Sequence, residues 1–168
     1  MRVAIICAVF AVATIFAPFA HAAKLGEEQS GLISQNCSSI KLQLQQLQRA
    51  DAKSRVHIGA QYETIYSNLM LNLNIRLIKN DLVATAVSAE QANFANERKL
   101  FKENYINYSQ ALDKLIAIDC KSAPQDFYEQ LKTTQEKRAE VDRSVDRLNK
   151  IVAEHKETVK AIQNGLDK

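Results

Sequence analysis

The chain has 168 residues, of which 46% are apolar and 24% are charged, a balance that excludes both a disordered tail and a membrane bundle. Its 4 Gly and 2 Pro residues are too few for the many turns of a sandwich, a barrel or a nucleotide-binding fold with a glycine-rich loop. The 22 basic and 19 acidic side chains give a formal charge of only +3, too weak to indicate a nucleic-acid or anionic-membrane partner.

The first 22 residues have the pattern of a secretory signal peptide. A positive start at Arg2 precedes an apolar run of about 15 residues, shorter than the roughly 20 needed to span a bilayer, and a small-residue cleavage motif, Ala-His-Ala, ends at Ala22. We expect residues 1–22 to be removed and the mature chain, from Ala23, to be secreted, periplasmic or at the cell surface. No membrane contact beyond this segment is expected; an uncleaved N-terminal anchor is the alternative.

Three heptad patterns predict three long helices. The clearest spans 123–165, where alternate steps of four and three residues from Phe127 meet mostly apolar side chains over more than five heptads. Similar patterns cover 38–79, where they place Leu69 on the inner face, and 82–118. The sequence therefore predicts an all-α fold, an elongated antiparallel three-helix bundle with coiled-coil-like packing.

The borders of these helices follow from polar breaks. The pair Asn80-Asp81 separates the first two helices, with Asp81 as the expected N-cap of the second, and Ser122 fits a capping box at the start of the third. Residues 23–35 are interpreted as a flexible lead-in, so that a single bundle domain occupies residues 36–166.

The mature chain keeps two cysteines, Cys37 and Cys120. Two cysteines in an exported chain indicate a disulfide more readily than a metal site, which needs more ligands at close spacing. If the chain folds back near Asn80, the cysteines lie about 42 and 41 residues from the turn and reach the same height at the open end of the hairpin. We therefore predict a Cys37–Cys120 disulfide worth about 4 kcal/mol by loop closure. Two free thiols are the alternative.

Two opposite charges occupy matching positions of the heptad pattern. Asp51 lies on the first helix at the height of Arg138 on the third, which predicts a buried or half-buried polar pair at core positions that fixes the register of the helices. A ligand or proton site, and a pair in which one or both side chains reach water, are the less favoured interpretations. The two mature histidines, His57 and His155, lie about 16 Å apart in height and cannot share a metal. Packing of His155 in the bundle is favoured over haem ligation by His155 with Met70.

An apolar surplus marks the segment before the turn. Apolar side chains between residues 69 and 78 cover most of the helix circumference, more than one packing face can bury. The residues proposed for partner contact here are Met70, Leu71, Ile75 and Ile78. Coverage by the chain's own neighbouring helices is the alternative and is slightly favoured.

The segment from Ile118 to Leu131, IDCKSAPQDFYEQL, resembles uncharacterised secreted bacterial helical-bundle proteins with an IDCKxxPxxFYxxL-like segment. The resemblance covers about 14 residues and implies no activity.

No pattern typical of a nucleophile elbow, phosphate loop or zinc motif occurs, so we expect no catalytic residues, metal or cofactor. The chain is interpreted as a non-enzymatic structural or interaction module with an unknown protein partner or self-association. The alternative is a chaperone-like or small-ligand-binding bundle in the periplasm, resting on the apolar surplus at residues 69–78.

Overall fold

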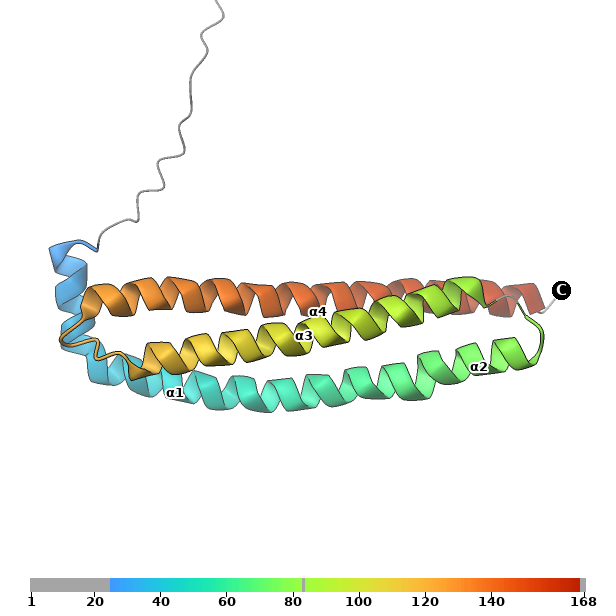
Figure 1. Cartoon of the computed structure of the whole chain (residues 1–168), viewed down its shortest axis with the longest axis horizontal. Coiled ribbons are helices and arrows are strands. Elements are labelled where there is room, and N and C mark those ends of the chain that lie inside the picture. The colour runs from blue at the N-terminus through green and yellow to red at the C-terminus, as the bar shows by residue number, and fades with distance from the viewer. Residues whose placement is uncertain (1–24, 83, 167–168) are drawn as a thin grey trace, which may run out of the picture.

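The computed structural model describes residues 25–82 and 84–166, so the predicted signal peptide lies outside the described residues. Three long helical rods run up, down and up along one another (Figure 1). The all-α bundle predicted from the heptad patterns is confirmed, and the described residues contain no strand. The longest helix has 43 residues, which corresponds to a rod of roughly 65 Å.

The first rod consists of α1 (Glu27–Thr64), a π-helical segment η1 (Ile65–Met70) and α2 (Leu71–Lys79). Because the helix begins at Glu27, the prediction that residues 23–35 form a flexible lead-in is wrong for most of that stretch. Its first turns cross the end of the bundle at an angle to the rest of α1 (Figure 1). Packing of Ile33 on the core near the disulfide and a bond from the Leu25 N–H to the Gln125 side chain, 3.1 Å, hold this end in place.

The segment η1 changes the phase of the first rod. A π-helical turn adds a residue to the turn, so every later side chain is rotated relative to an uninterrupted α-helix. The buried side chains of this part of the rod are accordingly those of Tyr62, Met70 and Leu77. Leu69, which the heptad pattern placed on the inner face, is 58% exposed.

The turn between α2 and α3 (Thr85–Ala117) closes α2 with a Schellman motif. The Leu82 N–H donates to the Leu77 carbonyl and the Asp81 N–H donates to the Ile78 carbonyl. Asp81 stands in the left-handed region, with φ of 55°. Its expected role as N-cap of the second helix is wrong, because that helix begins later, after Ala84.

The third rod, α4 (Pro124–Leu166), packs along α3 over most of its length. Most of its heptad positions face inward as predicted, from fully buried Phe127 and Leu148 to His155, which is 8% exposed, whereas Arg138 is exposed. The predicted capping box is absent, since the Ser122 hydroxyl donates to the Asp119 carboxylate, 2.7 Å. That hydrogen bond also lowers the pKa of the Asp119 carboxyl.

Candidate functional site

The disulfide closes the end of the bundle opposite the α2–α3 turn. The sulfur atoms of Cys37 and Cys120 are 2.01 Å apart and their Cα atoms 5.5 Å apart. Cys120 is fully buried, in one cluster with Leu115 and Phe127. The bond thus joins α1 to the α3–α4 connection. Its position agrees with the prediction, because the two cysteines lie nearly the same number of residues from the α2–α3 turn.

The structure brings Asp51 and Arg138 together, but their ion pair is not buried. Their closest N–O distance is 3.5 Å, and the two side chains are 45% (Arg138) and 20% (Asp51) exposed. Asp51 is thus half-buried, within the prediction, whereas the long arginine reaches water along the edge of the bundle, which was the less favoured interpretation, so the pair is not a core layer. The shorter contact to Asp51 comes from the buried Tyr108 hydroxyl, which donates to its carboxylate at 2.6 Å.

Sequence reasoning did not identify Tyr108 as part of this site. Tyr108 and Asp51 lie at similar distances in sequence from the α2–α3 turn, so the rise of the helices places them at nearly the same height of the α1–α3 hairpin. This sequence relation could have identified Tyr108 as a partner of Asp51. Burial, followed by the hydrogen bond to Asp51, strongly raises the pKa of the Tyr108 phenol. A phenol held protonated can donate to the carboxylate but cannot act as a base near neutral pH.

A small cavity of about 110 Å³ lies beside this contact, lined by side chains from all three rods. On α1 the stretch between Leu47 and Val56 carries only small or polar side chains, and three of its residues, Asp51, Ser54 and Arg55, line the cavity. The cavity walls include Asp51, Tyr108 and Arg138. Every buried side-chain polar atom in the described residues has a hydrogen-bond partner, so these groups form a satisfied structural layer.

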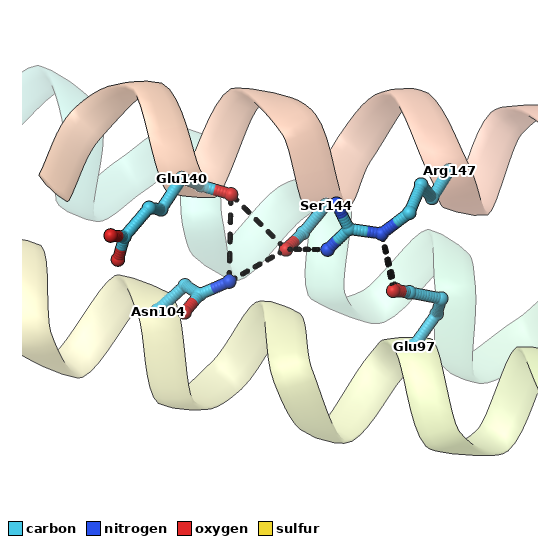
Figure 2. A network of polar contacts seen from close by, with 5 residues as sticks. All are labelled: Glu97, Asn104, Glu140, Ser144 and Arg147. Carbon is cyan, nitrogen blue, oxygen red and sulfur yellow. Dashed lines mark hydrogen bonds and ion pairs between the residues drawn. The ribbon is translucent and has the colours of Figure 1, made fainter. Parts of the chain in front are cut away.

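A second polar layer joins α3 to α4, as Figure 2 shows. The Asn104 amide donates to the Ser144 hydroxyl at 2.8 Å, and Ser144 is completely buried. Arg147 donates to the same hydroxyl at 3.1 Å and to the Glu97 carboxylate at 2.5 and 2.8 Å. The hydroxyl also donates to the Glu140 carbonyl, 3.2 Å. Because the heptad steps pass over Ser144, the sequence pattern could not reveal this layer.

The buried histidine has a partner that the sequence did not indicate. His155 Nδ1 lies 2.7 Å from one oxygen of Glu90, whose other oxygen accepts a bond from Thr158. His57 is exposed on α1. Within the described residues no group of three or more histidine, cysteine or carboxylate side chains is arranged to hold a metal ion.

The residues proposed for partner contact divide into two sets. Met70 is completely buried against Phe94 and Leu148, so its proposed role in partner contact is wrong; the π-helical segment turns it inward. Leu71 is half-buried, whereas Ile75 and Ile78 are 40% and 60% exposed. The spacing of four and three residues places Leu71, Ile75 and Ile78 on one face of α2, called the α2 stripe below.

Within the described part of the chain, no helix is long and apolar enough to cross a membrane. Comparisons with models of known protein families, with curated proteins and with solved structures find no match.

Proposed function

We propose that the protein is an exported, non-enzymatic interaction module that binds a protein partner through the α2 stripe. The observation that carries the proposal is the exposure of Ile75 and Ile78, 40% and 60%, at helical spacing beside the α2–α3 turn. An apolar face of this kind is what an amphipathic helix of a partner contacts when it docks in a helix-to-helix mode.

The charges around the α2 stripe favour a particular partner. Arg76 and Lys79 are exposed next to the isoleucines, and α2 contains no acidic residue. In a two-fold self-contact the same basic residues would meet each other, which is unfavourable. The surface therefore suits a different protein whose helix has an apolar face flanked by carboxylates.

Export is supported by the N-terminal pattern and by the disulfide, since disulfides persist in oxidising compartments. N-terminal sequencing of the exported protein should find a mature chain that begins near Ala23. A chain that starts at Met1 would contradict cleavage.

The test uses two synthetic amphipathic helical peptides with the same apolar face, one flanked by Glu and one by Lys. We expect the Glu-flanked peptide to bind at least about 10-fold more tightly by fluorescence anisotropy. The double variant Ile75→Ser/Ile78→Ser should lose this binding, whereas Leu42→Ser, at a position on α1 that is 53% exposed, should retain it.

Two outcomes would contradict the proposal. Equal binding of both peptides would mean that the basic residues do not select the partner. A wild-type dimer in light scattering that becomes monomeric in Ile75→Ser/Ile78→Ser would assign the stripe to self-association instead.

A further inference from the structure

A groove of about 500 Å³ runs between α1 and α3 near the middle of the bundle. It opens where α1 carries Gly59, because a Cβ atom at this position would meet nothing within 4 Å. Tyr62 and Phe101, both buried, are among its lining residues, and their rings pack edge to face at 5.9 Å. The groove therefore combines open space with a floor of two aromatic residues that are each only 6% exposed, and its volume falls within the usual range for small-molecule sites.

The charges that line this groove are all positive. Arg55 contributes from α1, and Arg98, Lys99 and Lys102 contribute from α3, whereas no Asp or Glu lines it. The groove on α3 and α4 that contains Arg147 and Lys150 differs, since two glutamates line it as well. A lining of four cations stands out in a chain with 22 basic and 19 acidic residues.

Two of the four cations lack a carboxylate partner. Arg98 pairs with Glu63, and Lys99 lies 3.9 Å from Glu103. Among the described residues, neither Arg55 nor Lys102 has a carboxylate oxygen within ion-pair distance of its charged nitrogen atoms.

Arg55 is also pre-positioned for an anion. Its guanidinium lies over the Tyr105 ring, 5.0 Å from the ring centroid, which restricts the side chain while leaving its N–H donors free for a ligand. Lys102 stands on α3 at the height of Arg55 in the α1–α3 hairpin. The two cations thus lie on opposite walls of the groove, beside its aromatic surface.

We propose that this groove binds a small anionic amphiphile, with the acid group between Arg55 and Lys102 and the apolar body over Tyr62 and Phe101. A carboxylate or sulfonate would supply the counter-charge that no residue lining this groove provides; the nearest carboxylates on the side of Arg55 line the adjoining cavity, at Asp51 and Asp142, and lie beyond ion-pair distance of it. An apolar body would fill the open space beside Gly59 and cover Val56, an apolar lining residue that is 67% exposed. This site goes beyond the proposed protein contact at the α2 stripe and does not depend on it. The sequence placed a ligand-binding alternative at residues 69–78, whereas the groove lies in the middle of the bundle.

The probe for this site is 1-anilinonaphthalene-8-sulfonate, an anionic aromatic amphiphile that fluoresces when it leaves water. We expect saturable binding of one probe per wild-type chain. Arg55→Gln/Lys102→Gln should weaken binding at least about 10-fold, since each charge-assisted hydrogen bond contributes strongly to affinity. Lys114→Gln/Lys156→Gln removes the same net charge at exposed positions outside the groove and should leave binding within about twofold of wild type.

A filled groove gives an independent variant that should still fold. Gly59→Leu places a side chain into the open space and removes a helix-interior glycine, so helicity and stability should be retained while the probe no longer binds. Dodecanoate should displace the probe from the wild-type protein, whereas the neutral dodecyl maltoside and inorganic phosphate should not.

Several results would overturn the proposal. Unchanged binding in Arg55→Gln/Lys102→Gln or in folded Gly59→Leu would exclude the groove, and equal competition by the neutral amphiphile would exclude recognition of the acid group. Loss of the probe in Ile75→Ser/Ile78→Ser would place it on the α2 stripe. Probe binding that is retained in Ile75→Ser/Ile78→Ser supports the groove, whether or not a protein partner binds the α2 stripe.

Discussion

Asp51 accepts from two partners whose contributions to stability should differ. Single and double variants built from Asp51→Ala, Tyr108→Phe and Arg138→Gln allow two double-mutant cycles that share Asp51. One cycle measures coupling to the buried tyrosine, and the other measures coupling to the half-exposed arginine.

The geometry sets the expected size of each coupling. The Tyr108 hydroxyl is 2.6 Å from the carboxylate and the residue is 3% exposed, so this charge-assisted bond should couple by about 1.5–3 kcal/mol. The Arg138 nitrogen is 3.5 Å away and its side chain is 45% exposed, so solvent screening should reduce that coupling to about 0.2–1 kcal/mol.

Urea unfolding followed by circular dichroism at 222 nm gives the free energy of each variant, with the disulfide intact throughout. The Tyr108 coupling should exceed the Arg138 coupling. If the arginine cycle gives the larger value, or the tyrosine cycle gives additive losses, the assignment of Tyr108 as the main partner of Asp51 is refuted.

Three further changes test separate parts of the fold. The double variant Cys37→Ser/Cys120→Ser should lower the free energy of unfolding by about 4 kcal/mol in urea titrations, because the bond closes a long loop; a loss below about 1 kcal/mol would contradict this. Burial, with the hydrogen bond to Asp51, raises the pKa of Tyr108 from its ordinary value of 10.0, so the folded state holds the phenolic proton more tightly than the unfolded chain. Stability should therefore fall as the pH rises above about 10, and Tyr108→Phe should reduce the slope of unfolding free energy against pH; an unchanged slope would refute this contribution. Asp81→Gly should raise the thermal midpoint by relieving the left-handed residue, with a gain of up to about 1 kcal/mol, whereas a lower midpoint would show that the aspartate is favourable there.

The course of α4 could be predicted because most of its heptad positions from Phe127 onward are apolar. From Phe127 to Leu148 and His155 the heptad steps follow the inner face, and a regular period is the physical signature of a packed helix face. The disulfide could be anticipated for a related reason, since the rise of a helix converts residue number into height on both arms of a hairpin.

The phase of the first rod could not be predicted in the same way. The π-helical segment Ile65–Met70 changes the number of residues per turn. The segment contains no glycine or proline from which the change could be predicted. A constant period therefore assigned Leu69 to the core and Met70 to the surface, the reverse of what is found. Only tertiary packing, which buries Met70 beside Phe94, reveals the shift.

Side-chain partners across helices were only partly accessible from sequence. Opposite charges at equal heights indicated Asp51 and Arg138, but a tyrosine in an apolar pattern is interpreted as core, so the role of Tyr108 was hidden. Ser144 and Asn104 carry no charge and lie off the heptad steps, although their hydrogen bond connects α3 to α4. Polar layers of this kind depend on side-chain direction, which a periodic pattern does not specify.

The central claim is that the α2 stripe binds a partner protein and is not part of the packed core. The most direct test measures both the unfolding free energy of Ile75→Ser/Ile78→Ser and its binding of the Glu-flanked peptide, with Leu77→Ala as the core reference. Leu77 is 4% exposed on the same helix, so its truncation should cost about 2–5 kcal/mol. We predict that the stripe variant stays within about 1 kcal/mol of wild type and loses peptide binding. A loss as large as that of Leu77→Ala, or peptide binding that persists in the stripe variant, would contradict the account.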